Sequence, residues 1–252
     1  MTAAIELREA SVIRARRPIL NQASLVCQPG QFSVFCGPNG AGKTTAFSVL
    51  SGAIKPDAGG VFLGMEPMAA IGADALARRR AVVAQQPVLT FPFLVHEVIA
   101  MGRTPHEGKT SLKTDQDIIE HALKALELEH LADRNYLTLS GGERQRVHIA
   151  RALAQIWPHD QDKSTIRWLL LDEPTSALDL KYEIALMRLL ADLARQGWGV
   201  VAVLHDLRLV LEYADHVILF KSGKTVDSGM PHDVLTPEAI QSTYDLDAPY
   251  AL

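Results

Sequence analysis

The chain has 252 residues, of which 48% are hydrophobic and 21% are charged, and its formal net charge is −4. This size and composition fit one globular unit with a substantial core, into which a smaller lobe can be inserted. Neither sign of charge forms a long run, so there is no electrostatic reason to expect nucleic acid as a partner. No signal-peptide pattern and no apolar run near the length of a membrane span occur. We expect a cytoplasmic protein, and docking on a membrane protein stays open.

The two cysteines, Cys27 and Cys36, lie in apolar segments that read as strands. We expect buried thiols rather than a disulfide. Neither cysteine has the company of a metal site, since no Cys-x-x-Cys or His-x-x-x-His spacing occurs.

Taken in chain order, short apolar runs bounded by turn residues predict strands, and apolar residues at helical spacing predict helices. The strands are expected at Ile5–Val12, Leu20–Val26, Gln31–Cys36, Arg80–Ala84, Trp168–Leu171, Val200–Leu204 and a hairpin over His216–Val226. The helices are expected at Lys43–Gly52, a helical stretch around Ile118–Leu128, Glu143–Ala154, Glu183–Arg195 and Pro237–Tyr244. The segment Pro56–Gly60 predicts a turn. Near-continuous apolar strands separated by an amphipathic helix indicate a parallel sheet covered on both faces.

The segment Gly37-Pro-Asn-Gly-Ala-Gly-Lys-Thr44 has the full spacing of a phosphate-binding loop, with a strand before it and a helix after it. Glycines let backbone N–H groups curl around phosphate oxygens, and the helix start adds its positive end. Lys43 is expected to reach the β- and γ-phosphates. The Thr44 hydroxyl is expected to ligate Mg²⁺, and Thr45 to contact the adjoining phosphate.

The apolar strand Leu169–Leu171 ends in two acids, Asp172 and Glu173. By itself this pattern also fits a strand that reaches solvent and turns at Pro174. After a phosphate loop, Asp172 is expected to hold Mg²⁺ through water, and Glu173 to polarise the attacking water.

The octapeptide Leu139-Ser-Gly-Gly-Glu-Arg-Gln-Arg146 is the most specific stretch of the chain. Ser140 can cap the helix that follows, and the two glycines let another group approach the backbone closely. Such a helix start attracts an anion.

In this order, the phosphate loop, this octapeptide and Leu169–Pro174 resemble the ATP-binding cassette (ABC) family, and the resemblance runs from about Ile5 to Tyr244. It implies an α/β fold of the P-loop NTPase type, with a RecA-like core, an N-terminal antiparallel β portion and an inserted helical subdomain. The expected division of the single ABC ATPase domain is a core of residues 1–86 and 156–230, a helical subdomain of 87–155 and a helical tail of 231–252.

The resemblance also implies roles for individual residues. Catalysis is assigned to Glu173, His205, Gln85 and Lys43, and Mg²⁺ to Thr44, Gln85 and Asp172, the last through water. Gln86 adjoins Gln85, so the glutamine assignment can be off by one position. ATP is assigned to the phosphate loop and the next residue, namely Gly37, Pro38, Asn39, Gly40, Ala41, Gly42, Lys43, Thr44 and Thr45. The nucleotide of a second subunit is assigned to the signature residues Ser140, Gly141, Gly142 and Glu143. The loop that joins two subunits, the D-loop, is assigned to Ser176, Ala177, Leu178 and Asp179.

The chain departs from the family at the adenine site. The family stacks adenine on an aromatic residue just past the first strand, and no aromatic residue lies between Met1 and Phe32. That position aligns with Arg14 or Ile13, and an arginine plane can also stack on a base.

A single cassette without fused membrane helices is typical of importers, and two-component exporters stay possible. The run Gln85–Arg103 resembles ATPases of iron-siderophore, cobalamin and hemin importers. Within it, Phe91-Pro-Phe93 and Met101-Gly-Arg103 are most similar to the hemin subgroup, as is the polar insertion Trp157–Trp168. A ferric-siderophore or cobalamin importer is the alternative, followed by a soluble ABC ATPase outside transport.

The resemblance implies ATP and Mg²⁺ as cofactors, and a homodimer that binds two membrane permease subunits on the cytoplasmic face of the bacterial inner membrane. A periplasmic binding protein would act indirectly, and nucleic acid is not expected. Residues around Phe91–Gly102 should form much of the groove that receives a permease helix. The nine histidines suggest heme binding, which we reject because substrate passes through the membrane subunits. His96 and His106 are expected to be exposed residues of the docking lobe or of a loop.

Overall fold

The structure is a computed structural model that describes residues 4–85, 89–158 and 165–248. The chain divides into two compact units, one made of Met1–Ile71 with Leu190–Leu252 and the other of Gly72–Leu189. Helix α6 (Leu180–Arg195) contains the boundary between them. Gln86 and most of the insertion Trp157–Trp168 lie outside the described residues.

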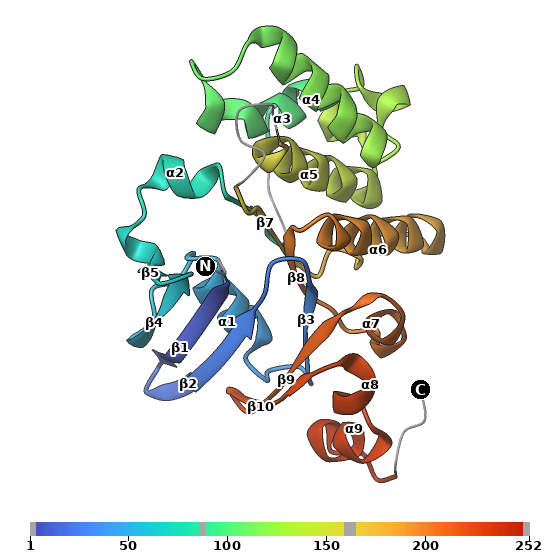
Figure 1. The fold of residues 1–252 in the computed structure, drawn as a ribbon. Helices are drawn as coiled ribbons and strands as arrows, with labels where there is room; N and C mark the ends of the chain where they lie inside the picture. Colours follow the sequence, from blue (N-terminus) through green and yellow to red (C-terminus); the bar gives the residue numbers. More distant parts are fainter. Residues whose placement is uncertain (1–3, 86–88, 159–164, 249–252) are drawn as a thin grey trace. The chain divides into compact units, whose positions relative to one another are not determined.

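The first unit contains an antiparallel sheet with the strand order β2-β1-β4-β5 (Figure 1). Its strands are β1 (Ile5–Arg14), β2 (Arg17–Cys27), β4 (Ala58–Leu63) and β5 (Glu66–Pro67). Apolar side chains of β1 at alternating positions are buried, as a sheet with one covered face requires. Helix α1 (Lys43–Leu50) packs on β1 and β2.

The same unit contains the strand that leads into the phosphate loop, together with the strands that pair with it. Strand β3 (Phe32–Cys36) pairs in parallel with both β8 (Gly199–Val203) and β9 (His216–Lys221), and β10 (Lys224–Gly229) pairs antiparallel with β9. Every residue of β3 and β8 is buried, which explains why their sequences are apolar except for Ser33 in β3. The remaining elements of this unit are η1 (Met68–Ala70), α7 (Leu207–Tyr213), α8 (Pro231–Val234) and α9 (Pro237–Tyr244).

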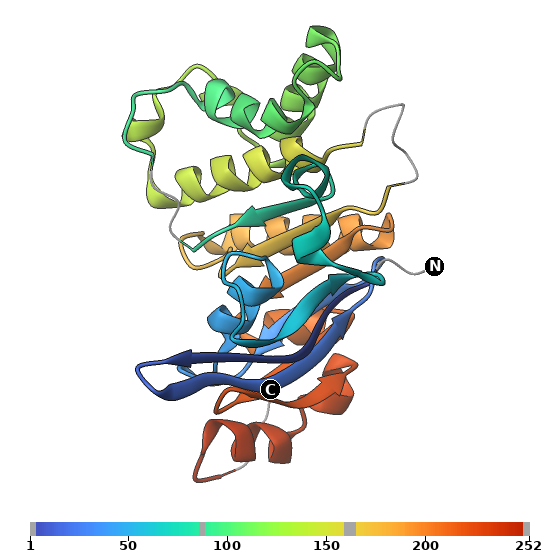
Figure 2. The ribbon, with the colours of Figure 1, turned by 90° about the vertical axis from the view of Figure 1, so that its left-hand side faces the viewer.

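The second unit contains two parallel strands, β6 (Arg80–Val83) and β7 (Trp168–Asp172). Its helices are α2 (Ala73–Ala77), α3 (Val95–Ala100), η2 (Met101–His106), α4 (Leu112–Ala125), η3 (Glu129–Leu131), η4 (Tyr136–Thr138) and α5 (Gly141–Ile156). Helices α3, α4 and η2 all pack on α5, which is drawn in yellow in Figure 2. Because α5 begins within the octapeptide, its packing against α3, α4 and η2 supports the helix that carries the octapeptide.

Most of the expected strands and helices are confirmed, and helix Pro237–Tyr244 has the expected bounds. The turn expected at Pro56–Gly60 is wrong in its second half, because Ala58, Gly59 and Gly60 belong to strand β4. Pairing with β1, in which Gly60 lies opposite Arg8 and Ala58 opposite Ser11, keeps this segment extended. Pairing with β1 therefore overrides the preference of this Ala-Gly-Gly sequence for a turn.

Both cysteines are free and buried, as expected, and burial raises the pKa of each thiol to about 12. Among the described residues, no helix has the length and apolar character that crossing a bilayer requires.

Candidate functional site: a phosphate loop and a signature helix

The phosphate loop connects the buried strand β3 to helix α1 in the first unit. Its three glycines, Gly37, Gly40 and Gly42, have positive φ, a backbone conformation that suits anion-binding loops. Gly42 is the N-cap of α1 and provides no side-chain hydrogen bond to the helix start. The first N–H groups of α1 are therefore left for an anion rather than satisfied by a cap.

Gly42 cannot be replaced without strain. Its φ is 98°, and a Cβ added there would lie 2.9 Å from the carbonyl oxygen of Ile19 and 3.2 Å from Cα of Gly223. The backbone N–H of Gly223 also donates to the carbonyl oxygen of Ala41 at 2.9 Å. The loop is thus held against the β9–β10 turn on one side and β2 on another.

Lys43 closes the loop. Its side chain is almost fully buried, and Nζ donates to the carbonyl oxygens of Gly37 (2.7 Å) and Pro38 (2.9 Å). The ammonium group therefore lies inside the ring of backbone that a phosphate would enter. Thr44, in the first turn of α1, is exposed, so its hydroxyl is accessible to a cation bound with the phosphates.

His205 belongs to the same unit as the loop. It lies after the end of β8, is exposed, and is followed by Asp206, which caps α7 by accepting from the N–H of Arg208 at 2.8 Å. The side chain of Arg208 also bonds to this carboxylate, and together these bonds lower the pKa of Asp206. The cap fixes the backbone next to His205.

Arg14, the residue assigned to adenine, lies at the exposed end of β1. Its Nη1 donates to the carbonyl oxygen of Ile13 at 2.9 Å and lies 3.8 Å from Oδ2 of Asp57. Ile13 and Ile19 are exposed large apolar side chains nearby in the β1–β2 hairpin. The adenine assignment to Arg14 stays a prediction.

In the second unit, β7 ends in the two expected acids. Asp172 is buried, and Glu173 follows with a φ of 50°, a left-handed conformation that is uncommon for a residue other than glycine. Such strain often occurs at functional sites because the surrounding structure maintains it. The turn is supported by Ser176, whose N–H and hydroxyl both donate to the carbonyl oxygen of Glu173.

The structure brings Gln85 and Glu173 together although 88 positions separate them in the chain. Nε2 of Gln85 donates to Oε2 of Glu173 at 2.7 Å. Gln85 follows β6, which pairs in parallel with β7, so both residues lie past the carboxyl ends of adjacent strands. This hydrogen bond from the Gln85 side-chain amide orients the carboxylate of Glu173, the residue predicted to be the general base.

The octapeptide begins α5 with a capping box. The Ser140 hydroxyl accepts from the N–H of Glu143 at 3.3 Å, and Oε2 of Glu143 accepts from the N–H of Ser140 at 2.7 Å. The bond from the Ser140 backbone is the main cause of the lowered pKa of Glu143. The box satisfies two of the backbone donors at the helix start and fixes the direction in which the others point.

The signature residues and the D-loop line one cavity of about 460 Å³. A Cβ added at Gly142 would lie 2.8 Å from the carbonyl oxygen of Ala177, so a glycine is needed for this close approach. Asp179 Oδ1 accepts from the N–H of Tyr182 at 3.1 Å, at the start of α6. All of this lies within the second unit, where the signature glycine Gly142 packs closely against the D-loop residue Ala177.

Tyr182 was not singled out from the sequence, although its ring lines the same cavity. The guanidinium of Arg146 lies over this ring, 3.8 Å from its centroid, and Nη1 of Arg146 donates to the carbonyl oxygens of Leu126 and Glu127. The last residue of the octapeptide thus joins α4, α5 and α6. An aromatic residue three positions after Asp179 was the only signal in the sequence.

Below the octapeptide, α5 contains a buried histidine. Nε2 of His148 lies 2.7 Å from the hydroxyl of Tyr136, and the two rings meet edge to face. Burial and, to a lesser extent, Arg151 lower the pKa of His148 to about 4. The imidazole is therefore neutral at physiological pH and shares a hydrogen bond with the Tyr136 hydroxyl.

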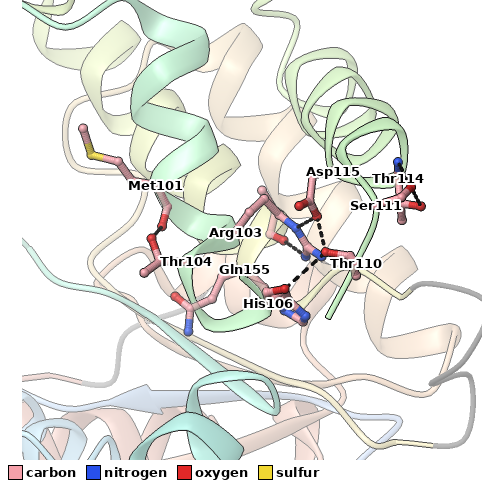
Figure 3. Close-up of polar contacts among 10 residues, drawn as sticks. Met101, Arg103, Thr104, His106, Thr110, Ser111, Thr114, Asp115 and Gln155 are labelled. Atoms are coloured by element: carbon pink, nitrogen blue, oxygen red, sulfur yellow. Dashed lines mark hydrogen bonds and ion pairs between the residues drawn. The ribbon is translucent and has the colours of Figure 1, made fainter. Parts of the chain in front are cut away.

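Met101-Gly-Arg103 has a structural task at the other end of α5 (Figure 3). Arg103 is buried, and it donates through Nε to Oδ1 of Asp115 (2.8 Å) and through Nη1 to the carbonyl oxygen of Ala154 (2.6 Å). A Cβ at Gly102 would lie 2.3 Å from the carbonyl oxygen of Arg151. The guanidinium thus neutralises the carbonyl end of α5.

The expectation that His106 is exposed is wrong. His106 is buried, and its Nε2 lies 2.8 Å from the carbonyl oxygen of Gln155, next to the Arg103 network (Figure 3). Gln155 continues the network by donating to the carbonyl oxygens of Ala77 and Arg80. A polar side chain was needed here because the last carbonyls of a helix have no partner within the helix.

Each unit therefore gathers its own part of the predicted set. The first holds the phosphate loop with Lys43, Thr44 and His205, and the second holds Gln85, Asp172 and Glu173 together with the signature and D-loop segments. A phosphate loop after a buried parallel strand, with carboxylates after another, defines a nucleotide-binding ATPase of the P-loop class.

Comparison with known proteins places the chain within that class. The family model described as ABC transporter matches residues 20–176. The hemin import ATP-binding protein HmuV of Hahella chejuensis is 44% identical over 240 residues, which cover 94% of this chain and 91% of that protein. HmuV of Plesiomonas shigelloides is 41% identical, with 96% and 95% covered. The chain belongs to the ABC transporter family and is an ATP-hydrolysing subunit.

Solved structures agree with this assignment. The dimeric ATP-binding cassette MJ0796 in a post-hydrolysis state with ADP and phosphate superposes with a TM-score of 0.76 at 26% identity, covering 90% of this chain and 98% of that one. An inward-facing ABC transporter of the metal-chelate type gives 0.77 at 27% identity, covering 96% and 89%. The predicted fold class, a P-loop NTPase with an antiparallel β portion and helical additions, is confirmed.

Proposed function

We propose that this chain is the ATPase of a bacterial hemin importer. The observation that supports this most strongly is the identity of 44% to the hemin import protein of Hahella chejuensis, over nearly the whole length of both proteins. The chain would act as a homodimer on two permease subunits at the cytoplasmic face of the inner membrane, with a periplasmic binding protein delivering the substrate.

In this proposal the loop Gly37–Thr45 binds the phosphates of ATP, through backbone N–H groups after Pro38 and through the ammonium of Lys43. Lys43 would exchange its bonds to the carbonyl oxygens of Gly37 and Pro38 for bonds to phosphate oxygens. His205 would contact the γ-phosphate. Ser140 and Gly142 would offer the start of α5 to the γ-phosphate on the second subunit, and the D-loop would report that contact to the same subunit's Glu173 through Ser176.

A magnesium ion suits the residues assigned to it. A hydroxyl at Thr44 and a carboxylate at Asp172 are hard oxygen donors, and the described residues contain no group of three or more His, Cys, Asp or Glu that could form a complete protein cage. Mg²⁺ commonly takes its remaining ligands from water and substrate phosphates. The ion would neutralise charge on the phosphates, and Gln85 would contribute from the end of β6.

Glu173 is the proposed general base. Its carboxylate is held by the amide of Gln85, so it can accept a proton from a water molecule in a fixed direction. Glu173→Gln should bind ATP and dimerise with it, while its turnover falls by roughly 10²- to 10⁴-fold, the usual contribution of a general base. Hydrolysis close to the wild-type rate would remove Glu173 from this role.

The helical subdomain, assigned to residues 87–155, is the proposed docking lobe for the permease. Phe91 is an exposed large apolar side chain, 66% accessible, and its ring lies 6.2 Å from that of Phe93. Exposed aromatic pairs suit burial against a partner helix. Arg103 and His106 are internal, so they would hold the lobe in shape rather than touch the permease.

An importer of another metal chelate is the second candidate, because the inward-facing metal-chelate transporter is similar over 96% of the chain. The ATPase rate of the transporter reconstituted with its permease and binding protein separates the two. Hemin-loaded binding protein should stimulate hydrolysis, and the same transporter with Glu173→Gln gives the background. Stimulation by a siderophore or corrinoid carrier, with none by hemin, would overturn the hemin assignment.

A further inference from the structure

The last helix of the chain contacts the first residue of the phosphate loop. The hydroxyl of Tyr244, at the end of α9, accepts a hydrogen bond from the backbone N–H of Gly37 at 3.1 Å. The pairing of β3 with β9 ends one residue earlier, at Cys36 and Leu219. Tyr244 therefore accepts from a backbone donor that lies one residue beyond the last β3–β9 pair.

Gly37 leaves no room for a side chain next to β9. Its φ is 141°, and a Cβ added there would lie 2.2 Å from the carbonyl oxygen of Phe220 on β9. The residue is enclosed between the β9 backbone and the tyrosine hydroxyl. The phosphate loop thus begins at a residue that is close to the backbone of Phe220 and donates a hydrogen bond to Tyr244.

The end of α9 is itself anchored to β9. Nζ of Lys221 donates to the carbonyl oxygen of Ser242 and, at 2.6 Å, to Oδ1 of Asp245. Asp245 is the C-cap of α9 with a φ of 54°, and it directly follows Tyr244. Because Lys221 directly follows Phe220, one short stretch of β9 borders Gly37 and fixes the helix that carries the tyrosine.

Tyr244 also lies close to His205, the residue of the first unit that is proposed to contact the γ-phosphate. Tyr244 and His205 line the same cavity of about 570 Å³, together with Arg208 and residues of α9. Burial is the main cause of the raised pKa of Tyr244, so the hydroxyl keeps its proton at physiological pH. A neutral hydroxyl can accept from Gly37 and still donate to a second group.

We propose that Tyr244 is a positioning residue for the phosphate loop: its hydroxyl holds the N–H of Gly37 and so fixes where the loop leaves β3. This rests on the proposed binding of ATP by Gly37–Thr45. The hydroxyl does not touch the nucleotide and acts through the loop. Its loss should weaken ATP binding and leave the chemical step, which belongs to Glu173, almost unchanged.

The decisive variant is Tyr244→Phe, which removes one oxygen atom and keeps the ring. A hydrogen bond of this kind corresponds to roughly three- to tenfold in an equilibrium constant. Titration of the purified protein with Mg-ATP should show the Kd rising by about that factor. In steady-state assays the KM for ATP should rise in parallel, with kcat within about twofold of the wild type.

Thr225→Val is the matched control. It removes a hydroxyl from the same unit that donates to the carbonyl oxygen of Ser24 at 3.1 Å, on the β10–β2 side and outside the nucleotide site. It should leave Kd, KM and kcat unchanged. Lys221→Met is the second test variant, because it keeps the tyrosine hydroxyl and releases the end of α9, and it should raise the Kd in the same direction.

An unchanged Kd in Tyr244→Phe would overturn the proposal. So would equal losses of kcat and melting temperature with no change in Kd, because a residue that serves only folding produces that pattern. A wild-type protein that neither binds nor hydrolyses Mg-ATP would instead remove the proposed function, and this inference with it. Cargo plays no part in these measurements, so they are independent of the hemin assignment.

Discussion

The phosphate loop and the signature segment both use glycines at the start of a helix, and they use them differently. At α1 the N-cap is Gly42, which has a left-handed backbone and no capping side chain. At α5 the N-cap is Ser140, which forms a complete capping box with Glu143. The first N–H groups of α1 therefore receive no hydrogen bond from a capping side chain. At α5 the capping box already uses some of the backbone donors, so only the others are available to a ligand.

The two segments also differ in what surrounds them. The glycines Gly37 and Gly42 are pressed against backbone of β9, β2 and the β9–β10 turn. Of the signature glycines, only Gly142 has a close neighbour, the D-loop carbonyl of Ala177, and Gly141 has space for a side chain. The loop therefore tolerates no side chain at these two positions. The signature keeps one glycine that its own subunit does not need.

The largest expected effect is on the loop. Lys43→Ala removes the ammonium group that lies inside it, and a charged hydrogen-bonding group of this kind contributes about 1.5–3 kcal/mol. The affinity for Mg-ATP, measured by calorimetry, should fall by roughly 10- to 150-fold. Lys224→Ala, at an exposed position of β10, should bind ATP as the wild type does. Equal affinities in both variants would contradict the role given to Lys43.

A pair of glycine substitutions tests the difference in backbone. Gly42→Ala should lower the free energy of unfolding by about 2–3 kcal/mol, because a left-handed backbone and a contact of 2.9 Å both oppose the new Cβ. Gly141→Ala, with its nearest neighbour at 3.9 Å, should change stability by less than about 1 kcal/mol. Urea denaturation of the two proteins measures both values.

The same pair has a functional reading. If Gly141 is kept for the partner's nucleotide, Gly141→Ala should bind ATP normally and dimerise poorly with it. A Gly141→Ala protein that dimerises as well as the wild type would show that this glycine serves neither the fold nor the partner. Gly42→Ala should lose ATP binding as well as stability, so the two variants differ in which step fails.

The signature helix should also be sensitive to acid. The pKa of His148 is about 4 in the folded protein and 6.5 when unperturbed, so the unfolded chain binds the proton first as the pH falls. The stabilisation is complete above pH 6.5 and is lost between pH 6.5 and 4. At pH 5 the loss should be about 2 kcal/mol, from 1.36 kcal/mol per pH unit.

Denaturation at pH 7 and pH 5 measures this loss. His148→Gln, which keeps an acceptor for the Tyr136 hydroxyl and does not titrate, should lose less stability on acidification than the wild type. His232→Gln, at an exposed position of α8, should keep the wild-type pH dependence. If His148→Gln and the wild type have the same slope, the acid sensitivity does not originate in α5.

How far the sequence could predict this molecule follows from the range of the interactions involved. Strands β3, β7 and β8 were predicted within a residue or two because they are buried on both faces and are mostly apolar in sequence. The start of β4 was missed because its Ala-Gly-Gly sequence is extended only through pairing with β1. Local pattern contains no information on such a partner.

The candidate site shows the same limit. The phosphate loop and the capping box are local, so their spacing is enough to predict them. The bond between Gln85 and Glu173 follows from adjacent parallel strands and is partly predictable. The burial of Arg103 and His106 was not, because charged residues are usually exposed and their carbonyl partners lie about 50 residues away. The contact of Tyr244 with Gly37 spans 207 positions and leaves no local signal.

The smallest expected effect separates capping from recognition at the signature. Ser140→Ala and Ser111→Ala each remove an N-cap hydroxyl, which accepts from Glu143 at 3.3 Å in α5 and from Thr114 at 3.0 Å in α4. Each should lower the free energy of unfolding by about 1 kcal/mol. Only Ser140→Ala should weaken ATP-driven dimerisation, measured by sedimentation in the Glu173→Gln background so that ATP persists. Equal dimerisation of the two variants would reduce Ser140 to an ordinary cap. A defect confined to Ser140→Ala would mean that one hydroxyl both caps its own helix and contacts the phosphate on the other subunit. The phosphate loop has no side chain with such a double role, because its N-cap residue is Gly42.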